Sequence, residues 1–194
     1  MNFDKSVLLA QVLNKSAALD PSEIDFITPL FQTECLRADS FFIQEGMPVQ
    51  KVAFVVSGIL RRYTVSKTGH IIILQFITDD HFFGDLDGYF RRRPSGVNVQ
   101  AITNCHLLTI KMEDLDMLKR ENQKFAAIIH FISEETINER IRTEEIIQKA
   151  SPYEKYQFFL THYSKWASRI PLNDVASYLQ IRPNTLSFIG SRQL

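Results

Sequence analysis

The sequence predicts an α+β chain in three parts: a β-rich N-terminal region, one long helix and a small helical C-terminal module. Short β-branched and aromatic runs separated by single glycines fill residues 36–110, and apolar residues at helical spacing continue from 112 to 149. Two shorter helical segments follow Pro152. Strands at spacings of about 8–12 residues are typical of an all-β sandwich or barrel. The expected units are 1–119, 120–149 and 150–194.

Two short helices are expected ahead of the β region, within residues 4–34. Apolar residues recur there at helical spacing, and Asp20-Pro21-Ser22-Glu23 has the composition of a helix start. The strands are predicted from their β-branched and aromatic residues at Ser40–Ile43, Lys51–Val56, Ile59–Val65, Ile71–Ile77, Val97–Ala101 and His106–Ile110. The segment Lys67–His70 predicts a hairpin turn in which Gly69 has a positive φ.

The apolar positions between Leu115 and Ile146 predict one long helix over much of this stretch. A helix of about 25–28 residues is about 40 Å long, which is more than a small domain can cover. One face should therefore meet another surface, and a second copy of the chain is the simplest partner. We expect a dimer face made of Phe125, Ile128, Ile132, Ile137 and Ile141.

The segment after Ala150-Ser151-Pro152 predicts a compact helical module. Proline disfavours helix in the residue before it, and Ser151 is a good N-cap for residues 153–166. Two short helices then follow, 173–180 and one beginning near Pro183, separated by a tight interruption. Their shared core is expected to contain Val175, Ala176, Leu179, Ile181, Leu186 and Ile189.

This pair of helices has the pattern of a helix-turn-helix. Pro183 fits the first turn of the second helix, where its missing N–H does no harm. The second helix would direct its polar side chains toward a DNA major groove. The expected DNA-contacting residues are Arg182, Asn184, Thr185, Ser187, Phe188, Ser191 and Arg192.

Overall charge gives no support for a nucleic-acid partner, because 22 basic residues balance 22 acidic ones. Residues 151–194 alone carry five basic and two acidic residues, so this part is locally basic. The N-terminal segment has no signal-peptide pattern and no apolar run of membrane-spanning length, and we expect a cytoplasmic protein with no membrane partner.

Cys35 and Cys105 are isolated from each other and from any histidine at metal-binding spacing. We therefore expect two buried, reduced thiols. An iron–sulfur cluster needs about four thiolates, and two cysteines cannot supply it within one chain. The sequence therefore predicts no metal site and no cofactor.

The order of parts resembles the Crp/Fnr (cyclic-AMP receptor and fumarate-nitrate regulator) family of transcription factors. The resemblance extends from about residue 24 to 192. Its most specific segments are Gln44–Gly46, Val55–Gly58, Gly69, Phe83–Leu86, Pro94–Ala101 and the terminal helix-turn-helix. It implies a double-stranded β-helix (jelly roll) that is cyclic-nucleotide-binding-like, a long dimerisation helix and a winged-helix-like module. As partners it implies DNA, a second copy of the chain, RNA polymerase and a small-molecule effector.

The resemblance places an effector pocket at Phe83, Gly84, Asp85, Leu86, Pro94, Ser95 and Gly96. In nucleotide-binding members a glutamate in this motif takes the ribose hydroxyl, and an arginine at its end meets the cyclic phosphate. Here Asp85 replaces the glutamate, and Pro94 or Ser95 stands where the arginine would be. The consecutive arginines 91–93 are typical of a solvated surface patch. We therefore predict weak or absent binding of cyclic AMP.

The second helix also departs from the family pattern. Members commonly carry Arg or Glu where this chain has Pro183 and Asn184, Arg where it has Phe188, and glycine where it has Gln180. Asn184 is suited to reading adenine and Phe188 to a thymine methyl group, so a different DNA site is expected. Phosphate contacts would come from Arg182, Arg192 and Lys165.

Two alternatives remain open. One is an interaction or scaffold module whose helix-turn-helix no longer binds DNA, which Phe188, Gly190 and the zero net charge would fit. The other is a jelly-roll metalloenzyme, but His70, His81 and His106 are scattered and no nucleophile is paired with a base. We expect no catalytic residues and no enzyme activity.

Overall fold

A computed structural model describes residues 4–15 and 18–191. The helices are α1 Lys5–Leu13, α2 Pro21–Ile27, η1 Thr28–Leu30, α3 Leu86–Phe90, α4 Met112–Glu121, α5 Gln123–Lys149, α6 Pro152–His162, η2 Ala167–Arg169, α7 Leu172–Leu179 and α8 Pro183–Ser191. The strands are β1 Gln32–Leu36, β2 Phe41–Ile43, β3 Lys51–Ser57, β4 Leu60–Val65, β5 Ile71–Ile77, β6 Phe82–Phe83, β7 Asn98–Ala101 and β8 Cys105–Lys111.

The strands form two four-stranded antiparallel sheets, with orders β1-β8-β3-β6 and β2-β7-β4-β5. Their facing side chains enclose a core that includes Val55, Leu60 and Leu107. This is the expected jelly roll, and β5 has the predicted bounds. The turn between β4 and β5 places Gly69 at φ 83°, also as predicted.

The sequence pattern did not reveal β1 and β6. β1 was assigned to the N-terminal helical region, yet it pairs along β8 from Gln32 to Leu36. Only one of its five residues is buried, so it has no continuous apolar pattern to mark it as a strand. β6 has two residues and is held in the sheet by pairing with β3.

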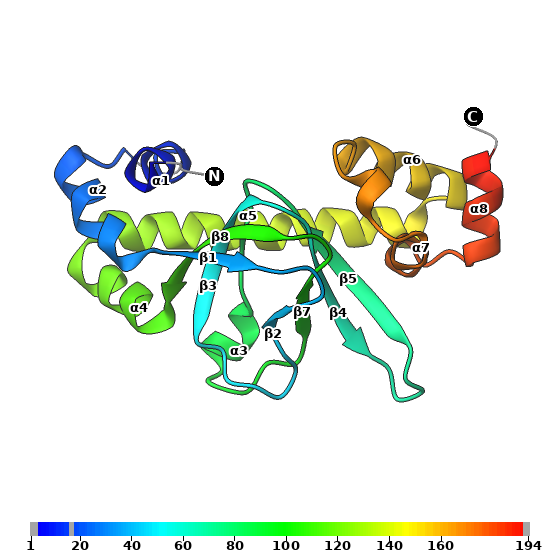
Figure 1. The fold of residues 1–194 in the computed structure, drawn as a ribbon, viewed down its shortest axis with the longest axis horizontal. Helices are drawn as coiled ribbons and strands as arrows, with labels where there is room; N and C mark the ends of the chain where they lie inside the picture. Colours follow the sequence, from blue (N-terminus) through cyan, green and yellow to red (C-terminus); the bar gives the residue numbers. More distant parts are fainter. Residues whose placement is uncertain (1–3, 16–17, 192–194) are drawn as a thin grey trace.

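The N-terminal helices cover one end of the roll (Figure 1). Asp20 and Glu23 form a reciprocal capping box at the start of α2, which confirms the predicted helix start. Leu9 and Ile27 are buried in a cluster that also contains residues of α4, α5 and the first sheet. The end of the roll is therefore closed by the chain's own helices.

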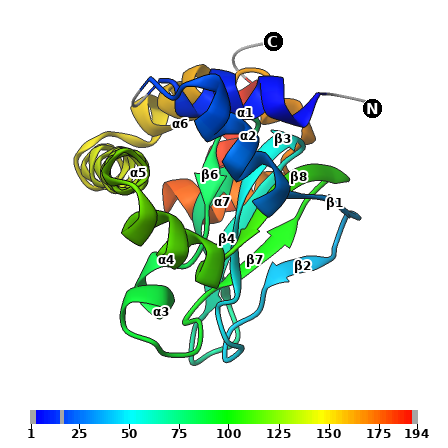
Figure 2. The ribbon, with the colours of Figure 1, turned by 90° about the vertical axis from the view of Figure 1, so that its left-hand side faces the viewer.

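The expected long helix is α5, which extends along the length of the molecule beside the roll (Figures 1 and 2). It begins at Gln123 rather than 120, because Asn122 has an extended backbone that separates it from α4. The Asn122 side chain accepts a hydrogen bond from the Lys124 N–H at 2.8 Å. Neither α5 nor any other helix in the described part of the chain is long and apolar enough to cross a membrane.

The C-terminal helices α6, α7 and α8 form a small module at the other end of α5 (Figure 1). Ser151 and Glu154 form a capping box at α6, as predicted for Ser151. Of the expected core residues, Val175, Ala176, Leu179, Ile181 and Leu186 are buried, and Ile189 is half-buried. The described residues 150–191 contain no β-strand, so the part expected to be winged-helix-like has no wing there.

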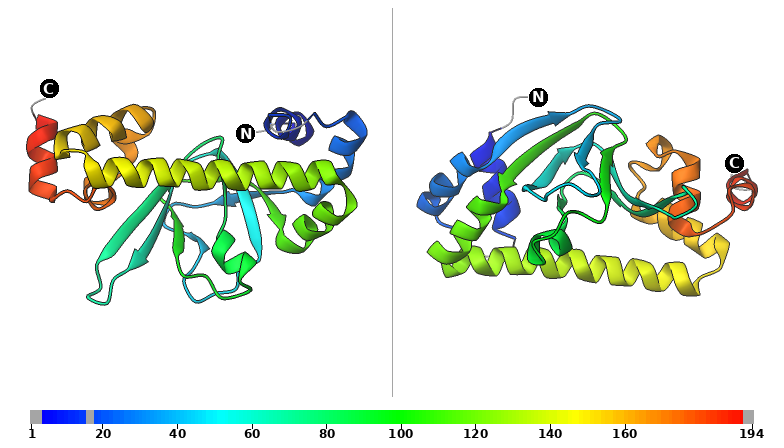
Figure 3. Two further views of the ribbon diagram at one scale, coloured as in Figure 1. Left: turned by 180° about the vertical axis from the view of Figure 1, so that it is seen from behind. Right: turned by 90° about the horizontal axis from the view of Figure 1, so that it is seen from below.

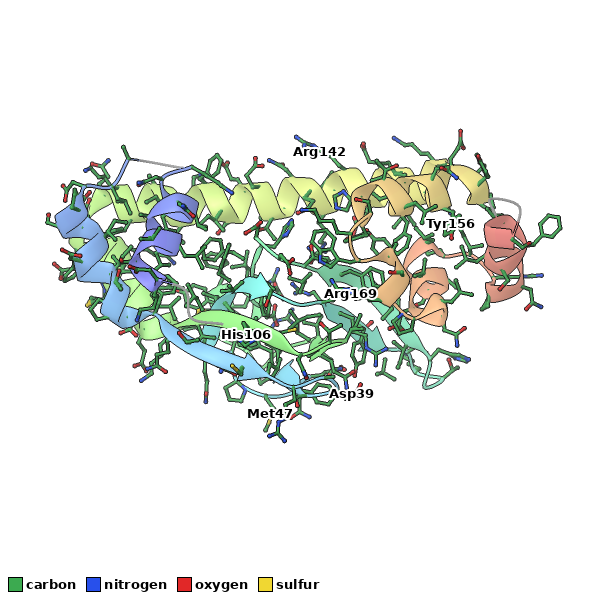
Figure 4. All side chains as sticks on the ribbon, turned by 45° about the horizontal axis from the view of Figure 1, so that its top comes forward. Asp39, Met47, His106, Arg142, Tyr156 and Arg169 are labelled. Carbon is green, nitrogen blue, oxygen red and sulfur yellow. The ribbon has the colours of Figure 1, made fainter. Side chains whose placement is uncertain are left out.

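The expectation of two buried thiols is correct only for Cys105. Cys105 is buried against Gly58, and this burial raises the pKa of its thiol. Cys35 is exposed, because it lies on the outward face of β1. Its Sγ is 3.3 Å from Nδ1 of His106 on the neighbouring strand (His106 is labelled in Figure 4).

Candidate functional site

A groove of about 690 Å³ lies between α5 and the roll, where Figure 3 shows the helix passing along one side of the strands. The roll contributes residues of β4, β5, β6 and α3, and α5 contributes residues from Phe125 to Glu144. Volumes of about 300–1,000 Å³ are typical of small-molecule sites. This groove is therefore a candidate effector pocket.

Asp85 lies buried in the wall of the groove, where its carboxylate is already occupied. The carboxylate accepts hydrogen bonds from the Gly88 N–H at 3.2 Å and from the Ser95 hydroxyl at 2.7 Å. The first of these caps the short helix α3. Asp85 therefore organises the Phe83–Leu86 turn and has little capacity left for a ribose hydroxyl.

Arg62 on β4 is the cation closest to Asp85, and the sequence analysis did not identify it. Its Nη2 is 3.4 Å from the Asp85 carboxylate and its Nη1 donates to the Gly84 carbonyl at 3.2 Å. Its Nε is buried and has no hydrogen-bond partner among the described residues. Burial lowers the pKa of the Arg62 guanidinium, while Asp85 acts in the opposite direction.

The pocket residues predicted from the family motif are only partly brought together. Those that line the groove are Phe83, Gly84, Asp85, Leu86 and Gly96. Ser95 lies behind the wall, where it holds Asp85, and Pro94 is exposed outside the groove. Pro94 and Ser95 are therefore not among the residues that line the groove.

The three consecutive arginines do not act as one anion site. Arg91 and Arg93 both pair with Asp87, and the Arg93 hydrogen bond is the main reason that the pKa of Asp87 is lowered. Arg93 is the member that also borders the groove. The expectation of a solvated patch agrees with the exposure of all three side chains.

The second candidate site is the two-helix unit α7–α8. Its turn, Gln180–Arg182, is tight because Gln180 has a left-handed backbone at φ 54° and the Ile181 N–H bonds back to the Ala176 carbonyl at 3.0 Å. Pro183 begins α8, as the sequence predicted. Leu186 is fully buried between the helices and fixes the face that α8 turns inward.

The outward face of α8 presents most of the predicted contact residues to solvent. Arg182, Asn184, Ser187, Phe188 and Ser191 are exposed, Thr185 is half-buried, and Arg192 lies outside the described residues. Lys165, in the segment after α6, is also exposed. The face therefore offers hydrogen-bonding groups, an aromatic ring and nearby positive charge to one partner.

The two-helix unit is anchored to the roll through α7. Arg61 Nη1 donates to both carboxylate oxygens of Asp174, at 2.9 and 2.7 Å, and the side chains are only 20% and 11% exposed. The Ser177 hydroxyl lies between the Ile73 N–H and the Ile71 carbonyl, at 3.0 and 3.1 Å. The edge of β5 is thus joined to α7 by hydrogen bonds.

An aromatic cluster completes this anchor. Phe76 of β5 packs against Phe159, Tyr163 and Tyr178, with ring centroids 5.1–6.1 Å apart. Burial is the main cause that raises the pKa of Tyr163 and of Tyr178. The hairpin β4–β5 therefore shares one core with the C-terminal module.

The residues of the predicted dimer face fall into two groups along α5. Phe125 and Ile128 are 4% and 3% exposed, because they pack against the N-terminal helices of their own chain. Ile132 is partly buried against the same cluster. Ile137 and Ile141 remain 51% and 52% exposed, and both border the groove. Only this C-terminal half of α5 has apolar side chains of the predicted set available to a partner.

Within residues 4–15 and 18–191, no three His, Cys, Asp or Glu side chains converge on a point that could hold a metal ion. The metalloenzyme alternative therefore has no candidate site in this part of the chain.

Residues 33–122 match the family of cyclic nucleotide-binding domains. The matched segment comprises most of the roll and α4, and it contains the Phe83–Leu86 turn, which is one of the segments that carry the resemblance. No curated protein matches the chain by sequence.

Solved structures extend the likeness beyond residues 33–122. FixK2 from Bradyrhizobium japonicum has a TM-score of 0.75 at 18% identity, covering 84% of this chain and 83% of its own. A transcriptional regulator of the Crp/Fnr family from Eubacterium rectale has a TM-score of 0.70 at 18% identity, covering 88% and 82%. The c-di-GMP-responsive global regulator CLP from Xanthomonas campestris has a TM-score of 0.70 at 15% identity, covering 90% and 91%. The predicted resemblance to the Crp/Fnr family is confirmed in the fold.

Proposed function

We propose that the chain is a homodimeric, DNA-binding transcription regulator of the Crp/Fnr type. The observation that carries the proposal is the α7–α8 unit: α7 is anchored to the roll, and α8 presents its polar face to solvent. A helix-turn-helix has this division of roles, with one helix holding the position of the helix that enters the major groove. DNA is therefore the proposed partner of α8.

Each residue of the α8 face has a proposed task. Asn184 suits bidentate hydrogen bonds to adenine, and Phe188 suits contact with a thymine methyl group. Arg182 and Lys165 would contact phosphates. Such contacts set the orientation of the protein on DNA and the salt dependence of its affinity, but they do not select bases. The site on DNA would then differ from one read by arginine–guanine pairs.

The groove is proposed to hold an effector that biases the position of the DNA-binding unit. Arg62 faces the groove, and its neighbour Arg61 holds Asp174 of α7. Successive side chains of a strand point to opposite faces. A ligand that moves β4 would therefore act on both surfaces, shifting the balance between two arrangements.

Dimerisation is proposed to use the second half of α5, where Ile137 and Ile141 are exposed. Two recognition helices in a dimer can reach half-sites about 34 Å apart on one face of a duplex. RNA polymerase is a further proposed partner, and we propose that the chain works in the cytoplasm as a regulator rather than an enzyme.

The test begins with selection of bound sequences from a random DNA pool. Binding of the selected site is then compared for the wild-type chain and Asn184→Ala. The variant should lose about 5- to 150-fold in affinity for that site, with an unchanged melting temperature, because Asn184 is exposed. Arg37→Gln is the control, since Arg37 is exposed on the roll, outside α8 and outside the proposed dimer face of α5.

Failure to enrich any sequence, with no salt-dependent retention on random DNA, would contradict the proposal. That result would favour the interaction-module alternative, in which α8 contacts a protein. Equal affinities of wild type and Asn184→Ala would instead remove Asn184 from base recognition.

A further inference from the structure

The geometry points to a long-chain carboxylate as the effector, with its head group at Arg62 and its aliphatic tail in the enclosed end of the groove. This inference rests on the proposed role of the roll as an effector domain, and it assigns the chemical class of the ligand.

The groove changes character along α5. Its lining residues on this helix are first apolar and then mostly polar: Phe125, Ile128, Ile129 and Ile132, followed by Ser133, Thr136, Ile137, Arg140, Ile141 and Glu144. From Phe125 to Glu144 the helix rises by about 28 Å. The groove is therefore long and has two chemically different ends.

The apolar end is enclosed. The residues that line it from other elements are buried: Leu13, Ile27, Phe31, Ile110 and Leu118. At the other end Leu74, Ile137 and Ile141 are 40–52% exposed in the single chain, so this end opens beside the proposed dimer face. Enclosed apolar space stays dry and accepts apolar ligands. A ligand would enter with its tail inward and leave its polar group near the opening.

Arg62 is the group that would hold an acidic head. Its guanidinium has two long contacts, at 3.2 and 3.4 Å, and its Nε lacks a partner among the described residues. A buried guanidinium with unmade hydrogen bonds is costly, and a carboxylate matches its planar set of donors. An acidic ligand would meet the Nη donors, whose contacts within the protein are long, because the Nε itself is shielded from solvent and the side chain is 15% exposed.

The other charged residues at this end of the groove already have partners of their own. Asp85 is held by Ser95 and Gly88, and Asp87 pairs with Arg91 and Arg93. Arg140 and Glu144 pair with each other at 3.7 Å, and both are more than half exposed. The positive charge of Arg140 contributes to lowering the pKa of the Arg62 guanidinium, because like charges repel each other. One ligand anion would reduce this repulsion.

A cyclic nucleotide fits these observations poorly. The acid of the Phe83–Leu86 turn is occupied, and Ser95 is committed to Asp85. A ribose and a base would also find few hydrogen-bonding groups in the enclosed apolar end. An aliphatic chain needs none.

The test is calorimetric titration of the purified full chain, without DNA, using dodecanoate below its micelle concentration. One dodecanoate should bind per chain. Dodecanol, which has the same chain length and no charge, should bind about ten-fold or more weakly, because it lacks the charge-assisted hydrogen bonds. Cyclic AMP should give no binding heat in the micromolar range.

Three variants locate the ligand. Arg62→Gln should weaken dodecanoate about ten-fold and leave dodecanol unchanged, whereas Arg142→Gln, on the outer side of α5, should change neither. Since Arg62→Gln removes the partner of buried Asp85, its melting curve is recorded first. Ile132→Trp tests the tail independently: this bulky residue, placed midway along the groove, should abolish hexadecanoate binding and spare octanoate.

Equal affinities for dodecanoate and dodecanol would overturn the inference, as would an unaltered chain-length preference in Ile132→Trp. Micromolar binding of cyclic AMP would overturn it in favour of the family's usual ligand. No DNA is present in these titrations, so a negative result is distinguishable from failure of the proposed DNA binding.

Discussion

Gln180 occupies a backbone conformation that favours glycine. Its φ of 54° lies in the left-handed region, and its N–H and that of Ile181 close the end of α7. A side chain with a Cβ costs about 1–2 kcal/mol in this conformation. The turn between α7 and α8 is therefore held under modest strain.

We predict that Gln180→Gly raises the free energy of unfolding by about 0.5–1 kcal/mol, after the greater entropy of glycine in the unfolded chain is subtracted. Chemical denaturation of both proteins measures the difference. Gln180→Ala is the matched control and should give no gain, because it keeps the Cβ. A destabilised glycine variant would show that the Gln180 side chain makes a favourable contact that outweighs the strain.

Glu139 on α5 and His162 on α6 connect the long helix to the C-terminal module. His162 Nε2 donates to Glu139 Oε1 at 3.1 Å, and this bond is the main reason that the pKa of Glu139 is lowered; the charge of His81 contributes in the same direction. This bond contributes fully to the free energy of unfolding at pH values above the ordinary pKa of a glutamate. The contribution is lost as the pH falls through the lowered pKa of Glu139.

The melting temperature of the wild-type chain should therefore fall more steeply than that of Glu139→Gln between about pH 5 and pH 3. Because both side chains are about one-third exposed, the difference should be small and should shrink in high salt. If the melting temperatures of the two proteins fell equally with pH over this range, the Glu139–His162 bond would not be the source of the pH dependence.

At the scale of the elements, β4 connects the groove to α7. Arg61 bridges Gln100 of β7 and Asp174 of α7, and Arg62 beside it faces the groove. A bulge between Arg62 and Tyr63 leaves Leu74 as the extra residue of β5, which also lines the groove. A change at the groove wall therefore has a short path to the α7–α8 unit.

Asp174→Asn should lower the free energy of unfolding by about 1–3 kcal/mol, because it leaves the mostly buried Arg61 without its counter-charge. Urea denaturation measures the loss. Glu145→Gln, which removes an exposed partner of Lys149, is the matched control and should change stability by less than about 0.5 kcal/mol. A loss no larger than that of the control would mean that the ion pair does not hold α7 on the roll.

The sequence predicted best those elements that have a local pattern of their own. β5 is a run of β-branched and aromatic residues, Asp20 and Ser151 begin capping boxes, and α7–α8 has a periodic apolar core. β1 has no such pattern, because it is held by pairing with β8 at the edge of a sheet. Long-range pairing leaves little trace in a short segment.

The candidate pocket was predicted only through the family motif, and its cation was missed. Arg61 and Arg62 are adjacent in a strand, so one of them had to point to each face of the sheet. That signal predicts one inward arginine. Its partner Asp85 is 23 positions away, and only the fold brings them together.

At the scale of the whole molecule, the proposed regulation requires that the groove, α5 and the α7–α8 unit operate as a two-fold assembly. Phe125, Ile128 and Ile132 of α5 pack within their own chain, and the exposed residues Phe131, Ile137 and Ile141 remain accessible to a partner. Their limited apolar area leads us to expect a dimer that DNA stabilises further, because binding to the assembled form shifts the equilibrium.

The most direct measurement is the mass of the complex between the full chain and its selected DNA site, by sedimentation or mass photometry. The account predicts two chains per duplex, on an inverted repeat whose half-sites are about 10 base pairs apart, centre to centre. One chain per duplex on a site without two-fold symmetry would contradict it.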